Sequence, residues 1–158
     1  MKKQIRSRHH LLTEIASHIR KLRSRERKWR SENDYIKRTQ SRVEEKLAEW
    51  VNQGKHREHN PSIQHIVEEL DITRDELAFY CATKLHKTFY TWRKELRIRE
   101  AQEIILEHPD MSFSQIAFSV GIPDKSDFRH QFKSVVGCTP GEWRRSNGHP
   151  KPPEAVLR

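Results

Sequence analysis

SFSQIAFSVGIPDKSDFRHQFKSVVGCTPGEWRR, residues 112–145, is the stretch of sequence that decides the fold. Ser112 and Gln115 have the spacing of a capping box, in which each side chain satisfies a backbone N–H at a helix start. Apolar residues then recur at helical spacing, at Phe113, Ile116, Ala117 and Val120. Gly121 follows where a left-handed residue ends a helix. The pattern predicts a short helix with one buried face.

A second helix is predicted directly after this turn, with Asp124 as its N-cap. Its buried face comprises Phe128, Phe132 and either Val135 or Val136. Its other face is rich in hydrogen-bond donors, at Lys125, Ser126, Arg129, His130 and Lys133. A short helix, a glycine turn and a donor-rich second helix are typical of a helix-turn-helix, whose second helix enters a DNA major groove.

The order and spacing of twelve residues in this region resemble the C-terminal signature of the AraC family of bacterial transcription regulators. They are Ile116, Ala117, Gly121, Ser126, Phe128, Phe132, Lys133, Gly137, Thr139, Pro140, Trp143 and Arg144. The resemblance covers roughly residues 43–145. It implies an all-α fold with two helix-turn-helix subdomains joined by a long linker helix, and binding to double-stranded DNA. The two cysteines, Cys81 and Cys138, lie far apart in the sequence, which fits a reducing cytoplasm.

The resemblance also assigns roles on the second recognition helix. Lys125, Ser126 and His130 are expected to read base edges, since all three can donate hydrogen bonds to purine acceptors. Arg129 and Lys133 are expected to hold backbone phosphates. For Arg144, phosphate contact and plain solvation stay open. The alternative for the five helix residues is a solvated face.

An earlier stretch has the same organisation. Asn60-Pro61 predicts a helix start with Asn as cap, and Thr73 with Glu76 predicts a capping box for the next helix. Three residues depart from the family pattern: Asp71 stands at the turn glycine, Cys81 at a core phenylalanine and His86 at another glycine. We expect Cys81 and Cys138 to be buried thiols.

Acidic residues outnumber basic ones in this first unit. Between Ser62 and Thr91 the acidic residues are Glu68, Glu69, Asp71, Asp75 and Glu76, against Arg74, Lys84 and Lys87. Carboxylates repel phosphate, so we expect the first unit to be the weaker DNA contact. The alternative function is a protein-interaction module that recruits polymerase or a partner regulator through this unit, with Phe79 as its anchor.

A long helix with little charge on its buried side is predicted to link the two units. Phe89, Trp92, Leu96, Ala101, Ile104 and Ile105 are its expected core residues. Arg93, Lys94, Arg97 and Arg99 alternate with glutamates, which is typical of a solvated face. His56 and His59 are expected to be surface histidines, since two ligands do not make a metal site.

The basic charge of the chain lies mainly before the first unit. The net charge is +9, and residues 1–33 contain 11 Lys and Arg against three acidic residues. Ile5, Leu12 and Ile19 fall every seven residues, and Ile15, Leu22 and Trp29 follow three positions later. Three interpretations stay open: a solvated basic helix, a homodimeric coiled coil, and an arm that contacts phosphate or follows a membrane helix, with Lys2, Lys3, Arg6 and Arg8 at the membrane surface.

The predicted domains are a basic N-terminal helix at 1–38, the tandem helix-turn-helix domain at 39–146 and a flexible tail at 147–158. Asn33 to Gln40 is polar and marks the first boundary. The chain has no phosphate loop, CxxC pair or nucleophile with a recognisable base, so we predict no enzyme, cofactor, metal or small-molecule domain.

Overall fold

The structure, a computed structural model, describes the backbone of residues 2–59 and 61–147, and side chains from Glu14 onward except Ile15. The described elements are all helical: α1 (Lys2–Asn52), η1 (Lys55–Arg57), α2 (Ile63–Glu69), α3 (Arg74–Tyr80), η2 (Cys81–Leu85), α4 (Phe89–Glu107), α5 (Phe113–Ser119), α6 (Lys125–Val136) and α7 (Pro140–Asn147). This confirms the all-α prediction. The chain divides between Arg42 and Val43 into an N-terminal and a C-terminal part, each compact by itself.

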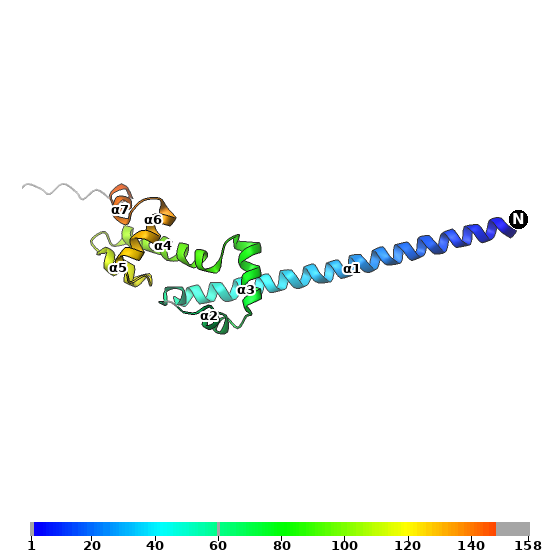
Figure 1. Cartoon of the computed structure of the whole chain (residues 1–158), viewed down its shortest axis with the longest axis horizontal. Coiled ribbons are helices and arrows are strands. Elements are labelled where there is room, and N and C mark those ends of the chain that lie inside the picture. Colours follow the sequence, from blue (N-terminus) through cyan, green and yellow to red (C-terminus); the bar gives the residue numbers. More distant parts are fainter. Residues whose placement is uncertain (1, 60, 148–158) are drawn as a thin grey trace, which may run out of the picture. The chain divides into compact units, whose positions relative to one another are not determined.

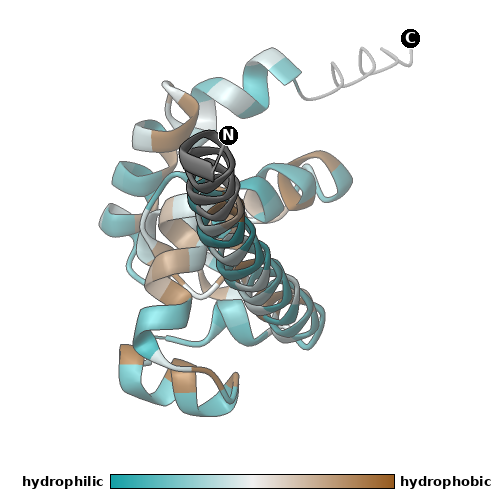
Figure 2. Ribbon diagram, turned by 90° about the vertical axis from the view of Figure 1, so that its right-hand side faces the viewer, coloured by the Kyte–Doolittle hydropathy of each residue, from teal (hydrophilic) through white to brown (hydrophobic). Residues whose placement is uncertain are grey.

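The N-terminal part, up to Arg42, belongs to α1 and is largely hydrophilic along its described residues (Figure 2). Ile19, Leu22 and Trp29 are exposed there, at 42%, 49% and 64%. The side chains of Ile5, Leu12 and Ile15 lie outside the described residues. The helix continues without a break through residues 33–40. None of the described helices is both long and apolar enough to cross a membrane.

The C-terminal part, from Val43 onward, contains two hydrophobic cores, and both include residues of α4. Figure 1 labels this helix. The first core joins Val43, Leu47 and Trp50 of α1 to α2, α3 and Phe89. The second core joins the C-terminal half of α4 to α5 and α6, with Phe128 and Phe132 at its centre. Because α4 contributes to both cores, it is the linker helix that the sequence predicts. The choice between Val135 and Val136 is settled: Val136 packs on the core and Val135 is exposed.

Most of the predicted helix caps are confirmed. Thr73 with Glu76 and Ser112 with Gln115 form complete capping boxes, and Asp124 caps α6 by accepting the Asp127 N–H at 2.7 Å. The predicted cap of α2 is wrong. Ser62 is the cap, and its hydroxyl accepts the His65 N–H at 3.1 Å; Asn60 lies outside the described residues. Ser62 itself is extended, so the helix begins after the proline and not at it.

The glycine positions of the family pattern are left-handed here whatever residue occupies them. Gly121 has φ +75°, while Asp71 and His86, which replace glycines in the first unit, have φ +49° and +53°. Of the two cysteines, Cys81 is buried as predicted, and burial raises the pKa of its thiol. Cys138 is only half-buried, which corrects the prediction for that residue.

Candidate nucleic-acid interface

Two phenylalanines on the buried side of α6 determine which face of this helix is exposed. Phe128 and Phe132 are one turn apart and fully buried, and their rings pack at 5.8 Å. The predicted contact residues on the opposite side are all exposed: Lys125, Ser126, Arg129, His130 and Lys133. Among the described residues, none of these five side chains has a hydrogen bond or ion pair. They are therefore available to an external ligand.

Two of these cations line a hollow at the start of α6. Lys125 and Arg129 share a hollow of about 350 Å³ with Arg145 of α7. Glu142 also lines it, but its carboxylate accepts the Thr139 N–H and hydroxyl, both at 2.7 Å, which lowers its pKa. The hollow therefore carries three cations and one ionised carboxylate that caps α7.

Arg144 differs from the other predicted contact residues because it is held inside the fold. Its Nη2 donates to the Met111 carbonyl at 2.8 Å, and its guanidinium lies 3.9 Å from the centre of the Phe113 ring. Its Nε is buried, with no partner in the described part of the chain, and burial lowers the pKa of the group. Arg144 thus fastens α7 to the start of α5, an internal role that the sequence did not indicate.

The first unit presents a different face at the same helical positions. Counted from the N-caps Thr73 and Asp124, the start of α3 matches the start of α6. Arg74 corresponds to Lys125, Asp75 to Ser126, Ala78 to Arg129, Phe79 to His130 and Ala82 to Lys133. Two cations of α6 are replaced by alanines, and an uncharged serine is replaced by an aspartate.

Much of the negative charge of the first unit is already engaged by its own residues. Glu69 accepts hydrogen bonds from Lys55 at 2.8 Å and from the Trp50 indole at 3.2 Å, and these contacts lower its pKa. Asp71 pairs with Lys46 at 3.2 Å. Glu76 is held by its capping box. Glu68 and Asp75 are exposed and have no ion pair among the described residues, so only part of the negative charge counted in the sequence stays open to the surroundings.

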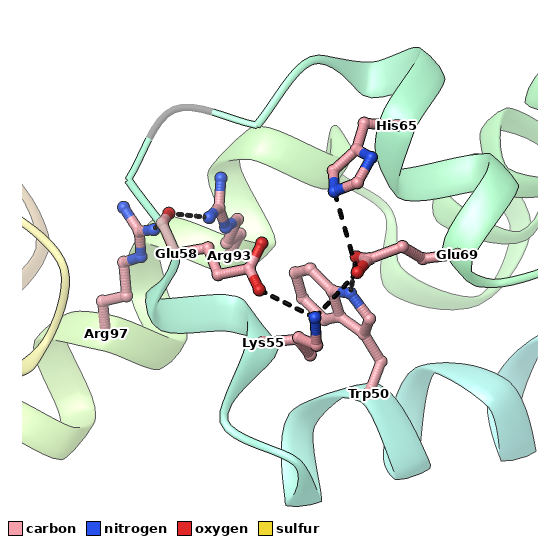
Figure 3. Close-up of polar contacts among 7 residues, drawn as sticks. All are labelled: Trp50, Lys55, Glu58, His65, Glu69, Arg93 and Arg97. Carbon is pink, nitrogen blue, oxygen red and sulfur yellow. Dashed lines mark hydrogen bonds and ion pairs between the residues drawn. The ribbon is translucent and has the colours of Figure 1, made fainter.

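A short strap between α1 and α2, residues 54–58, connects the two units. Arg93 and Arg97 of α4 both donate to the His56 carbonyl, at 2.9 and 2.6 Å, and both donate to the Glu58 carbonyl (Figure 3). The prediction of a solvated face is therefore wrong for these two arginines, which are only 5% and 8% exposed. The prediction of a surface histidine is wrong for His56, which is buried and contacts Glu100 at 3.1 Å.

Side chains around the strap form a polar cluster. Glu58, His65 and Glu69 bring potential metal-ligand atoms within 4.8 Å of one another. The Lys55 ammonium lies between the two carboxylates, 2.9 Å from Glu58 and 2.8 Å from Glu69 (Figure 3). Lys55 thus neutralises the place where a cation would bind, and the cluster serves to fasten the strap to α2.

Comparison with known proteins shows which family the chain resembles. A family model described as a helix-turn-helix domain matches residues 66–146, just over half of the chain. Among curated proteins, the chain is similar to YdeC, an uncharacterized HTH-type transcriptional regulator of Bacillus subtilis (strain 168), with 22% identity over 116 residues. The match covers 73% of this chain and 39% of YdeC, so the chain spans about two fifths of that relative.

Two solved structures share the fold. One is the C-terminal domain of AraT, a response regulator from Geobacillus stearothermophilus, with a TM-score of 0.57 and 17% identity over 78% of this chain and 93% of that one. The other is a protein of unknown function from Listeria innocua, with a TM-score of 0.55 and 22% identity over 66% of this chain and 95% of that one. With the matched residues, the left-handed turn positions and the shared linker helix, the chain belongs to the AraC-type helix-turn-helix family of DNA-binding transcription regulators.

Proposed function

We propose that this protein is a transcription regulator that binds double-stranded DNA in a sequence-specific manner, with α6 as its dominant reading element. The observation that carries the proposal is the contrast between the two recognition helices. The outer face of α6 has five exposed polar side chains without hydrogen-bond or ion-pair partners among the described residues. The matched positions of α3 and η2 have one cation, Arg74, one aspartate, Asp75, two alanines and a phenylalanine.

Each side chain on α6 has a definite chemistry toward DNA. Lys125 can donate to guanine O6 or N7, His130 to a purine N7, and Ser126 can donate or accept. Arg129 and Lys133 lie farther along the same exposed face and suit phosphate contacts, which fix register without reading sequence. Arg144 can reach a phosphate only with the part of its guanidinium that the Met111 carbonyl leaves free.

The test is selection from a random duplex DNA library at two salt concentrations, followed by sequencing of the enriched duplexes. Enrichment of a motif confined to one major groove is expected if α6 dominates. A motif that extends over two adjacent grooves would show that α3 reads bases too. Binding without any motif and with a steep salt dependence would mean that only charge attracts the DNA, and sequence-specific reading would be refuted.

Two substitutions separate the roles on α6. We expect Arg129→Ala to weaken binding to all duplexes about equally and to reduce the slope of log K against log salt by about 0.9, since one phosphate contact is lost. We expect Lys125→Ala to relax preference at one base pair, with a discrimination loss of about 1–3 kcal/mol. An unchanged preference profile for Lys125→Ala would contradict its base contact.

Protein partners form the second part of the proposal. A homodimer through the N-terminal helix is supported by Ile19, Leu22 and Trp29, which are exposed at heptad spacing. Docking of polymerase or a partner regulator on the first unit is supported by Phe79, which is 39% exposed on a recognition helix that has few donors. Loss of partner recruitment in Phe79→Ala with unchanged DNA binding would support this second candidate.

A further inference from the structure

A hollow lined by cations lies between the linker helix and the second recognition helix. It has a volume of about 440 Å³ and is lined by Pro61, Tyr90, Arg93, Lys94, Arg97 and Gln131. Four of these residues come from one face of α4, and Gln131 comes from α6. Three of the lining residues are cations, and none is acidic.

The two arginines in this hollow are held rigidly and keep donors to spare. Their contacts with the strap use Nε and Nη2 of Arg93, and the same two atoms of Arg97. Within the described residues, Nη1 of each guanidinium has no hydrogen-bond partner. Rigid guanidinium groups with unused donors suit the oxygens of a phosphate group, because little side-chain order is lost on binding.

The charges of Glu58 and Glu100 favour the ionised forms of Arg93 and Arg97, but they offset the cations only in part, because the nearby carboxylates form ion pairs with other residues. Glu58 pairs with Lys55, Glu95 pairs with Lys87 at 2.6 Å, and Glu100 pairs with His56 and Arg57. Burial, together with the adjacent charge of Arg93, lowers the pKa of Arg97 to about 10. An anion in the hollow would relieve this repulsion.

We propose that this hollow is a phosphate-binding site, in which Lys94 and the free guanidinium nitrogens of Arg93 and Arg97 contact the phosphate oxygens. Tyr90 and Gln131 supply neutral donors at its edge. The phosphate is either a backbone phosphate of bound DNA or part of a free phosphorylated molecule. The site does not depend on base reading by α6, since no predicted base-contacting residue lines it.

Lys94 is the residue to test, because Arg93 and Arg97 also hold the strap. Its ammonium lies 3.5 Å from the Ser134 hydroxyl, and Lys94→Gln removes the charge while it keeps a polar side chain at this half-buried position. Arg99→Gln is the matched control, since Arg99 is exposed on the same helix and does not line the hollow. Thermal unfolding of both variants shows whether the fold is kept.

The first arm titrates the intact chain with inorganic pyrophosphate in a calorimeter, against sodium chloride at matched ionic strength. We expect Lys94→Gln to weaken pyrophosphate binding about tenfold, as expected for one charge-assisted hydrogen bond, while Arg99→Gln binds as the wild type does. The second arm measures duplex DNA binding over a range of salt concentrations. If the slope of log K against log salt falls by about 0.9 in Lys94→Gln and not in Arg99→Gln, the ligand is a backbone phosphate.

Each combination of results decides the question. Pyrophosphate binding that depends on Lys94, with an unchanged DNA slope, supports a free phosphorylated ligand. A changed slope without pyrophosphate binding supports the DNA backbone. The proposal is overturned if Lys94→Gln behaves like Arg99→Gln in both arms. If the wild type binds no duplex at all, the proposed function fails, and the pyrophosphate arm still decides this site.

Discussion

At the scale of single residues, Gly121 is held by a neighbour from a distant part of the chain. A Cβ atom built on it would lie 1.8 Å from the carbonyl oxygen of Arg57, which belongs to the strap. Its φ of +75° is also unfavourable for other residues. The turn of the second helix-turn-helix therefore rests directly on backbone that leads out of α1, and side-chain rotation cannot relieve the clash.

We expect Gly121→Ala to destabilise the protein by about 2 kcal/mol more than Gly137→Ala, because both glycines have positive φ but only Gly121 adds a clash. Gly137 has φ +89° with open space where its Cβ would lie. Urea unfolding of both variants measures the difference. Equal losses would show that the strap moves away from the turn at little cost.

Glu69 is the residue whose charge links stability to pH. Lys55 holds the pKa of Glu69 below its ordinary value, so the folded state favours the ionised form. That stability is present above the ordinary glutamate pKa and is lost as pH falls through the lowered pKa of the folded state. We expect Glu69→Gln to lower the free energy of unfolding by about 1 kcal/mol at pH 7, and we expect this difference from the wild type to disappear in acid. Thermal unfolding over a range of pH measures it.

The comparison for Glu69→Gln is Glu103→Gln, which removes a negative charge that has no ion pair among the described residues. If both variants lose the same stability at pH 7, the contact with Lys55 and Trp50 contributes nothing beyond net charge. A stability difference between the wild type and Glu69→Gln that grows as the pH falls would contradict the expected pH dependence.

At the scale of elements, α3 and α6 each begin at a side-chain N-cap, Thr73 and Asp124, and they differ in the outer face. Ala78 occupies the position of Arg129. We expect Ala78→Arg to strengthen duplex binding several-fold and to raise the salt slope by about 0.9, because α3 then gains a phosphate contact. Ala48→Arg adds the same charge on an exposed face of α1 that is not a recognition helix. No difference between these variants would place α3 away from the DNA.

The helices and their faces could be predicted because their determinants are local. The two residues of a capping box, such as Ser112 and Gln115, are three positions apart, and the buried pair Phe128 and Phe132 is four positions apart. The strap could not be predicted in this way. Arg93 and Arg97 bind backbone carbonyls 35 to 41 residues away. Because every residue has a backbone carbonyl, the sequence does not show which of them accept these hydrogen bonds. Both arginines therefore resembled charges on a solvated face.

The same reasoning applies to the candidate site. The outward residues of α6 follow from the buried phenylalanines, so their exposure could be predicted, whereas their DNA contacts stay proposals. For Arg144 the sequence left phosphate contact and solvation open, and it did not indicate the contacts with Met111 and Phe113. The hollow beside Lys94 was also missed, because its residues come from two helices and a loop.

At the scale of the whole molecule, the N-terminal helix joins a sparse apolar seam to a strongly basic surface. Ile19, Leu22 and Trp29 form the exposed part of the seam. We expect the mass of the intact chain to rise with concentration in sedimentation experiments, and Leu22→Glu to keep it monomeric. Tyr35→Glu is the control, since Tyr35 is exposed on the same helix at a position outside the seam. A monomer mass at all concentrations would contradict the homodimer.

Charge determines the conditions under which this dimer forms. Arg23, Arg25 and Arg30 lie in the positions that flank the seam, and among the described residues only Arg30 of these three has an ion pair, with Glu26 at 2.6 Å. Two copies of the helix therefore bring like charges together. We expect added salt to strengthen dimerisation, because it screens this repulsion while the apolar contact persists. Phosphates of a duplex would neutralise the same arginines. Dimerisation would then be favoured on DNA and weak in its absence, which sedimentation with and without duplex can distinguish.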